Sequence, residues 1–471
     1  MFNNHSDNEK GRALRVDIQV SGRCLLAALL AVFSSLSLAA DSREIHLDQH
    51  PWLEPIWALN VGGSHYQSVH GVTFQADDCE VAEVCGRLEA VTGTQQEPVY
   101  LSYREGVQSY RFRVAEGAYA LTLYFAETKN TPDRTFQIRF NGVVYDNQFN
   151  IPRFRDGLTD AALARTWANI EPVDGVIQLD LESGSALPIL SGIALERRTD
   201  EQLGRLRWAD EFSGTGLDSR YWTIDEWPAR KVNDEDQAYV ASAATVRVDE
   251  GRLVLEAHQV NEPDAIYHSG RVHSLGKIDF RYGRLDVRAR VPKGQGVWPA
   301  IWLLPTHPYR YASSCDARNP DWQGASDCDA WPNSGEIDLM EHVGFEPGIV
   351  HGTVHTRGYY WVQGNQRKGS VVLNNLGDTF HVYSLRWRPD RLDMFVDDNR
   401  YFTYSREQSD WRQWPFDHAF HIVMNLAVGG QWGRAGGPID PSIFPQSLEI
   451  DYVRVYEVAP VPSEATNEKG K

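Results

Sequence analysis

Alternating hydrophobic and polar residues dominate two separate stretches of the chain. In the first, residues 110–114, 136–140 and 177–181 each carry apolar side chains at every second position, which is the period of a strand with one buried face. The second stretch repeats this pattern in residues 284–291 and 382–387. The first stretch lacks any long segment with the 3.6-residue period of a helix, and many short strands in succession indicate an all-β protein.

Turn residues between these segments predict how the strands connect. Asn141-Gly142 separates residues 136–140 from 143–145, and Asn-Gly strongly favours a type I′ hairpin. Pro389-Asp390 follows residues 382–387 and precedes a further short apolar segment. We therefore expect two β-sandwich domains, at residues 41–200 and 201–458, joined through a charged stretch at 196–204. Residues 459–471 are expected to form a polar tail.

The N-terminus has the pattern of a secretory signal peptide. Basic residues precede an apolar run at residues 25–38 that ends in the small residues Ala39 and Ala40; these basic residues are Lys10, Arg12, Arg15 and Arg23. The run is short for a membrane span of about 20 residues, so we predict cleavage near residue 40 and a secreted protein, extracellular or periplasmic. No later segment is long and apolar enough to span a membrane, so the mature chain is expected to have no membrane span.

The cysteines agree with an oxidising compartment. Outside the signal they form two close pairs, Cys79 with Cys85 and Cys315 with Cys328, for which we expect one local disulfide in each domain. No histidines flank either pair at the spacing of a zinc site. We expect a monomer.

The charge balance excludes some classes of partner. The formal net charge of −18 argues against nucleic acid, whose phosphates would repel such a surface. It also disfavours sulfated or uronic polysaccharides. A neutral substrate fits better.

Three acids in one short segment carry the candidate chemistry. Glu336 and Asp338 are two residues apart, so on a strand they share a face. The third acid, Glu341, lies three residues after Asp338, so strict alternation would point it to the opposite face. A β-bulge would turn Met340 into the core and Glu341 to the side of the other acids. A solvated acidic strand or a calcium site is the alternative interpretation.

Clustered acids suit glycosidic bond hydrolysis. Packed carboxylates cannot all ionise freely, so at least one pKa rises, and a glycosidase needs one ionised carboxylate and one protonated acid. Carboxylates about 5–5.5 Å apart give a retaining mechanism. We assign Glu336 as nucleophile and Glu341 as acid/base, with Asp338 hydrogen-bonding the nucleophile. Trp298, Trp302 and Trp331 nearby suit the flat faces of sugars, although a single tryptophan is more often a core residue.

The segment Glu336-Ile-Asp-Leu-Met-Glu341 resembles the motif of glycoside hydrolase family 16, in its bulged, laminarinase-like branch. The resemblance covers about residues 205–457, and its ordered motifs include Trp208-Ala-Asp-Glu-Phe212, Val297-Trp-Pro-Ala-Ile-Trp302 and His351-Gly-Thr-Val-His355. It implies a β-jelly-roll with a concave cleft and no cofactor for catalysis. It also places Arg271, Trp298, Trp302 and Trp331 on the glycone side of that cleft, and His355 near the reaction centre.

The same resemblance implies a structural calcium ion on the convex face. Glu211, Gly251 and Asp451 occupy the matching positions, the first two through backbone carbonyls. One departure is Asp234-Glu-Asp-Gln-Ala-Tyr239, where the family often begins with Asn. Asp keeps an acceptor and loses a donor, which puts one sugar contact in doubt.

The first domain is similar to the malectin family. Ala58-Leu-Asn-Val-Gly-Gly63, residues 119–127 and Pro188-Ile-Leu-Ser-Gly-Ile193 carry the similarity. It implies a glycan-binding β-sandwich, and so a carbohydrate-binding module that concentrates the enzyme on a polymer. Tyr66, Phe74 and Tyr124 are candidate ligand contacts or core residues.

The function expected from all of this is endo-acting, retaining hydrolysis of neutral, laminarin-like β-1,3-glucan, with mixed-linkage β-1,3-1,4-glucan open as a second substrate. An agarase or carrageenase is one alternative, but it would need basic residues for its substrate. An inactive glucan-recognition protein is another, but it should have lost a catalytic carboxylate. Transglycosylation also stays open, because a sugar can capture the same glycosyl-enzyme.

Overall fold

The computed structural model describes residues 41–46, 56–77, 85–128, 131, 133–155, 157–197, 203–318, 322–323 and 327–457. The expected signal peptide, the polar tail and Cys79 lie outside these residues. Within them the protein is nearly all strand, as predicted, and its helices are single turns: α1 (Glu97–Tyr100), α2 (Ala330–Asn333), α3 (Gly430–Gly433), η1 (Pro152–Arg155), η2 (Trp361–Gln363) and η3 (Pro441–Ile443). None of the described helices has the length and apolar character needed to cross a membrane.

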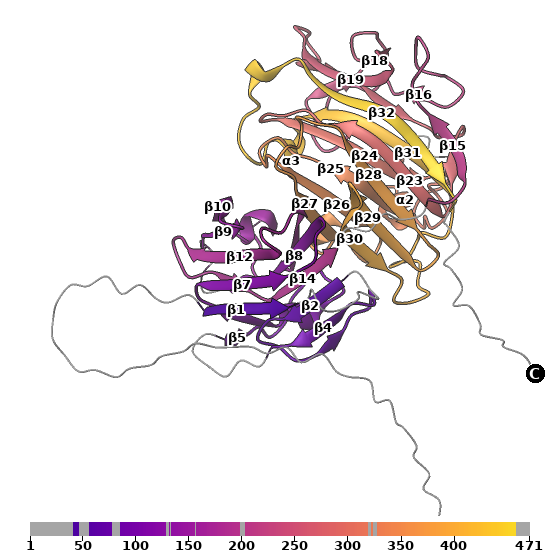
Figure 1. The fold of residues 1–471 in the computed structure, drawn as a ribbon. Coiled ribbons are helices and arrows are strands. Elements are labelled where there is room, and N and C mark those ends of the chain that lie inside the picture. Colours follow the sequence, from indigo (N-terminus) through magenta and orange to yellow (C-terminus); the bar gives the residue numbers. More distant parts are fainter. Residues whose placement is uncertain are drawn as a thin grey trace, which may run out of the picture.

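The C-terminal half of the chain is a sandwich of two layers built mostly of antiparallel strands (Figure 1). One layer is a ten-stranded sheet in the order β17 (Gln237–Tyr239), β20 (Tyr267–Ser269), β19 (Arg252–Gln259), β32 (Gln446–Tyr456), β23 (Gly283–Arg290), β28 (His381–Trp387), β29 (Arg391–Val396) and β30 (Asn399–Ser405), with β15 (Leu206–Asp210) on β32 and β18 (Val246–Asp249) on β19.

The other layer continues into the N-terminal domain as one fourteen-stranded sheet. Its catalytic part runs β16 (Thr223–Ile224), β21 (Arg271–His273), β31 (Phe420–Val428), β24 (Val297–Pro305), β25 (Glu336–Glu341), β26 (Ile349–His355) and β27 (Arg367–Val372), with β22 (Asp279–Phe280) on β31. Its N-terminal part runs β11 (Leu163–Ile170), β8 (Tyr119–Phe125), β14 (Gly192–Arg197), β2 (Ile56–Asn60), β4 (Thr73–Ala76) and β3 (Tyr66–Gln67). The link is parallel pairing of β27 with β11.

A second sheet completes the N-terminal sandwich, in the order β1 (Asp41–His46), β7 (Gln108–Arg113), β12 (Val176–Ser183), β9 (Phe136–Phe140) and β10 (Val143–Phe149). A small sheet of β13 (Ile189–Leu190), β6 (Ser102–Glu105) and β5 (Cys85–Arg87) flanks it. The Asn141-Gly142 hairpin joins β9 to β10, and both turn residues have positive φ, as a type I′ turn requires.

Each sandwich has its own hydrophobic core. Leu285 and Val287 of β23 pack in the catalytic core, whereas Tyr110 and Phe112 of β7 pack in the N-terminal core. These are residues whose alternation predicted the strands.

Candidate active site

Strand β25 presents the three acids beside one another. Its register against β26 shifts between Asp338 and Glu341, so the predicted β-bulge is present. Leu339 and Met340, the two residues inside the bulge, are fully buried. The bulge therefore keeps Glu341 on the same side of the strand as Glu336.

Two tryptophans orient the outer carboxylates. Trp331, in α2, donates its indole N–H to Glu336 Oε2 at 2.9 Å, and Trp298, on β24, donates to Glu341 Oε1 at 3.1 Å. A donated hydrogen bond stabilises the ionised carboxylate. Each of the two acids therefore has its own partner.

Burial and the repulsion between their negative charges raise the pKa values of these carboxyl groups. Burial raises the pKa of Glu336, and the charge of Glu341 raises it further, whereas hydrogen bonds from Trp331 and Asp338 act to lower it. Burial also raises the pKa of Glu341, while the Trp298 hydrogen bond and the charge of Lys368 act to lower it. The pKa of Asp338 lies well above its usual value, first through burial and then through the charges of Glu336 and Glu341. Asp338 is therefore suited to be protonated and to donate a hydrogen bond to Glu336.

His355 lies against the same acids from β26. Its Nε2 is 3.4 Å from Asp338 Oδ2 and 3.8 Å from Glu336 Oε1. Burial, followed by the charge of Lys368, lowers its pKa to about 3, so the imidazole is neutral. Among the described residues, Glu336, Asp338 and His355 are the group of side chains close enough together to share a metal ion. Calcium, which takes six to eight oxygen ligands, would find too few oxygens there.

Arg271 lies between two indole rings at the β21 side of the sheet. Its guanidinium carbon is 4.3 Å from the centroid of the Trp227 ring and 4.9 Å from that of Trp302. Its Nε donates to Asp225 Oδ2 at 2.7 Å, so charge and orientation are both fixed. The sequence analysis did not select Trp227, because nothing in its local pattern distinguishes it from a core residue.

Further aromatic residues complete the surroundings of the acids. The Trp302 indole N–H donates to Asn425 Oδ1 at 2.7 Å. Trp432, in α3, packs edge-on against Trp298 with ring centroids 5.5 Å apart. Tyr360 packs edge-on against Trp331 at 5.7 Å. Tyr360 is a partner that only the fold brings to this site.

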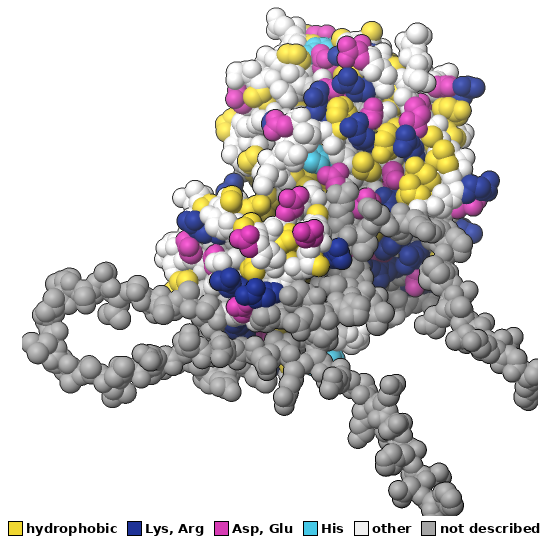
Figure 2. Space-filling view, viewed as in Figure 1, with side chains coloured by type: hydrophobic (Ala, Val, Ile, Leu, Met, Phe, Trp, Pro, Cys, Tyr) yellow, Lys and Arg dark blue, Asp and Glu magenta, His cyan; other side chains and the backbone are white. Residues whose placement is uncertain are grey.

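The departure at Asp234 is accommodated by charge pairing. Arg434 pairs with Asp234 and with Asp236, so the extra negative charge is matched by an arginine. On the face seen in Figure 2, acidic and basic side chains are interspersed across the catalytic domain, and neither sign forms a continuous field.

The residues expected at a calcium ion lie on neighbouring segments of the ten-stranded sheet. Glu211 directly follows β15, Gly251 is in the turn between β18 and β19, and Asp451 is on β32, which pairs with both β15 and β19. The Asp451 carboxylate, however, pairs with Arg288. A bound calcium would have to replace that partner, so this site stays a prediction.

The remaining candidates are the cysteines and the aromatic residues of the N-terminal domain. Cys315 and Cys328 form a disulfide in the loop before α2, and Cys85 belongs to the small N-terminal sheet. Phe74 and Tyr124 are buried, with ring centroids 5.5 Å apart. Tyr66 is partly buried against Phe74, at 6.1 Å. These aromatics form part of a core cluster.

The chain is similar to proteins of known family. Residues 233–454 match the family model for glycosyl hydrolases family 16, and residues 55–185 match that for the malectin domain. A beta-glucanase of Rhodothermus marinus is 43% identical over 258 residues, which cover 53% of this chain and 84% of that protein. Glucan endo-1,3-beta-glucosidase A1 of Niallia circulans is 35% identical, over 54% of this chain and 38% of that protein. The X-ray structure of the Rhodothermus marinus laminarinase has a TM-score of 0.48 and 42% identity, over 54% of this chain and 97% of that one. The chain belongs to glycosyl hydrolases family 16 and is a glycoside hydrolase with an N-terminal malectin domain.

Proposed function

We propose that this enzyme is a secreted, endo-acting hydrolase of β-1,3-glucan that retains anomeric configuration. The observation that carries the proposal is the placement of Glu336, Asp338 and Glu341 on one bulged strand, with a tryptophan donor on each outer carboxylate. The names of the two relatives reported above, a beta-glucanase and a glucan endo-1,3-beta-glucosidase, support the choice of substrate.

The proposed reaction is a double displacement. The ionised Glu336 attacks the anomeric carbon while Glu341 gives its proton to the departing glycosidic oxygen, forming a glycosyl-enzyme. Glu341, now ionised, takes a proton from a water molecule that attacks the same carbon and releases Glu336. Asp338 donates its proton in a hydrogen bond to Glu336, which favours the ionised nucleophile before each turnover.

Secretion and the wider substrate range are further parts of the proposal. Secretion rests on the signal-like residues 1–40. Mixed-linkage β-1,3-1,4-glucan is a second proposed substrate, and the protein is proposed to act as a monomer. Arg271 and Trp302 are proposed to bind sugars on the glycone side.

The test is product analysis on laminarin, lichenan, agarose and carrageenan, for the wild type and for Glu336→Gln. We expect internal cleavage of laminarin by the wild type and a loss of at least about a thousandfold in the variant, since the nucleophile is removed. Glu262→Gln, at an exposed glutamate, is the matched control and should keep full activity. Cleavage of agarose alone would reject the substrate.

The stereochemistry is tested separately. Proton NMR of the first-formed product should show the β-anomer before mutarotation. An initial α-anomer would reject double displacement and the role of Glu336 as nucleophile.

A further inference from the structure

The face of the shared sheet that carries the acids does not end with the catalytic domain. Glu341 pairs in register with His351 on β26, His351 with Ser370 on β27, and Ser370 with Arg165 on β11. Residues directly opposite on paired strands share a face, so these four side chains form a row. With strands about 4.8 Å apart, Arg165 of the N-terminal domain lies about 14 Å along the sheet from Glu341.

The core of the N-terminal sandwich packs against the face of the shared sheet that carries the acids. Ile349 is two residues from His351, and Trp167 is two residues from Arg165, so both point to the same face as the row. Both belong, with Phe154, to the N-terminal core. Val350 and Val371, which point the opposite way, belong to the catalytic core. The second N-terminal sheet therefore rises on the same side of the shared sheet as the acids. In Figure 1 its strands β9 and β10 lie at the left, below α3.

Helix η1 is held directly over the end of the row. The guanidinium of Arg165 is buried beneath the Phe154 ring of η1, with its carbon 3.9 Å from the ring centroid. Arg165 Nε also donates to Ser370 Oγ of the catalytic domain at 3.1 Å. A desolvated cation–π contact is strongly attractive, so together with the hydrogen bond to Ser370 it holds η1 against β11 and β27.

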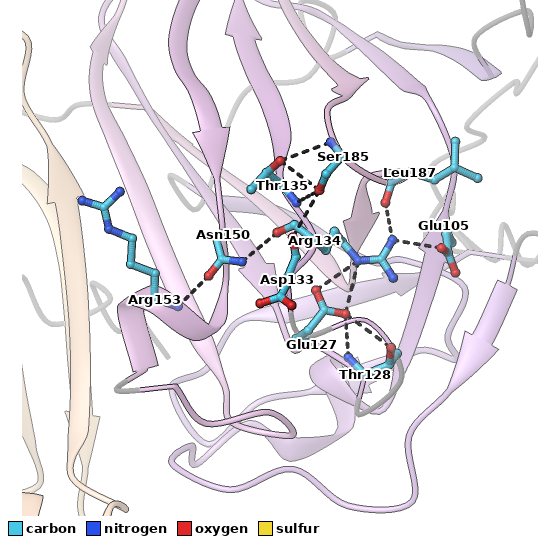
Figure 3. Close-up of polar contacts among 10 residues, drawn as sticks. All are labelled: Glu105, Glu127, Thr128, Asp133, Arg134, Thr135, Asn150, Arg153, Ser185 and Leu187. Atoms are coloured by element: carbon cyan, nitrogen blue, oxygen red, sulfur yellow. Dashed lines mark hydrogen bonds and ion pairs between the residues drawn. The ribbon is translucent and has the colours of Figure 1, made fainter.

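A buried ion cluster holds the other side of η1 (Figure 3). Arg134, only 1% exposed, pairs with Glu127 at 3.0 Å and with Glu105 at 2.9 Å. Asn150 Nδ2 donates to the Arg134 carbonyl oxygen at 2.8 Å, and Asn150 Oδ1 accepts the backbone N–H of Arg153 at 2.8 Å. The side chain of Arg153 points away from this cluster in Figure 3 and is exposed.

The N-terminal domain also touches the rim of the acid site. A Cβ atom on Gly364 would lie 3.5 Å from Leu158 Cδ1. Gly364 ends the short helix η2 in the loop that carries Tyr360, and Tyr360 packs on Trp331, the donor to Glu336. The acid site is therefore connected to the N-terminal domain in two ways, through the row of side chains that ends at Arg165 and through the contact of Gly364 with Leu158.

We propose that η1 of the N-terminal domain forms one end of the substrate cleft and that Arg153 binds hydroxyl groups of the glucan chain there. This inference rests on the proposed function. Of the four residues expected on the glycone side, Arg271, Trp298 and Trp302 lie on β21 and β24, across β25 from η1. The fourth, Trp331 in α2, bonds Glu336 at the centre of the site, so we place η1 at the aglycone end. A guanidinium offers five N–H donors, which suit the hydroxyls of a neutral sugar. The N-terminal domain is then part of the cleft and sets how the chain is positioned on its aglycone side.

The test uses the full chain and laminari-oligosaccharides of increasing, defined length, cleaved in H₂¹⁸O so that mass spectrometry locates each cut. In Arg153→Ala we expect kcat/KM to fall roughly three- to tenfold for substrates long enough to reach η1, the loss of one charged hydrogen bond at an exposed site. The shortest cleaved substrate should be unaffected. Cuts in longer substrates should move toward the reducing end, because binding modes that fill the lost contact become less populated.

Arg111→Ala, at an exposed arginine on β7, is the matched control and should leave rates and cut positions unchanged. Equal losses at every length, or an unchanged pattern in Arg153→Ala, would overturn the role of η1 and leave the proposed function standing. A wild type that cleaves none of these oligosaccharides would reject the proposed function, and this inference with it.

Discussion

Burial and one hydrogen bond together set the proton affinity of the acid/base residue. Burial raises the pKa of Glu341, and the indole of Trp298, which donates to Glu341 and stabilises its ionised form, opposes that rise. As a proton donor, Glu341 must be protonated, so kcat/KM should fall as the pH rises through its pKa. The Trp298 indole thus limits activity on the alkaline side.

Replacing that donor should therefore extend the alkaline range. In Trp298→Phe the ionised form of Glu341 loses a stabilising partner, its pKa rises, and the alkaline limb of the pH profile of kcat/KM should move up by about one unit. Trp302→Phe is the control, because the Trp302 indole binds Asn425 and no carboxylate. A limb that stays in place, or moves down, would contradict the role of Trp298.

At the scale of elements, the local sequence pattern predicted the strands and the bulge, but not the side chains from distant segments that stabilise them. Alternation located strands such as β7, β9 and β28, and the spacing of the three acids required the bulge in β25. The partners of these segments come from distant parts of the chain. Tyr401 on β30, for example, donates its hydroxyl to the Leu339 carbonyl inside the bulge, and no local signal marks a tyrosine for that position. Trp227 beside Arg271 was missed for the same reason.

The bulge should depend on that tyrosine. In Tyr401→Phe a buried carbonyl at Leu339 loses its hydroxyl partner, so we expect the free energy of unfolding to fall by about 1–3 kcal/mol. The rate should fall as well, since Glu341 sits at the end of the bulge. Tyr383→Phe is the matched control, because the Tyr383 hydroxyl is buried and has no hydrogen-bond partner among the described residues. Denaturant unfolding with laminarin kinetics gives both readouts, and equal stability losses in the two variants would contradict the assignment.

At the scale of the whole molecule, two sandwiches were expected and one continuous sheet joins them. The join is backbone pairing between β27 and β11, and backbone hydrogen bonds leave no side-chain pattern in the sequence. A second contact is electrostatic. Asp393 lies fully buried on β29 beside Arg391 and Arg400, Arg391 donates to the carbonyl oxygen of His70, and Arg400 pairs with Glu196 of the N-terminal domain.

This contact should make the joined protein sensitive to acid. Burial acts to raise the pKa of Asp393, but the neighbouring arginines outweigh it and hold the pKa far below the ordinary 3.8. A carboxylate with a depressed pKa stabilises the fold above its unfolded value and loses that contribution as the pH falls toward its folded value. Calorimetry should therefore show one shared transition for both domains at neutral pH, with a midpoint that drops steeply below about pH 4.

Asp393→Asn should lower the neutral midpoint and flatten the acid dependence, because the titrating charge is gone, whereas Asp390→Asn, in the exposed turn before β29, should behave as wild type. Two separate transitions in the wild type would show that the sheet does not couple the domains.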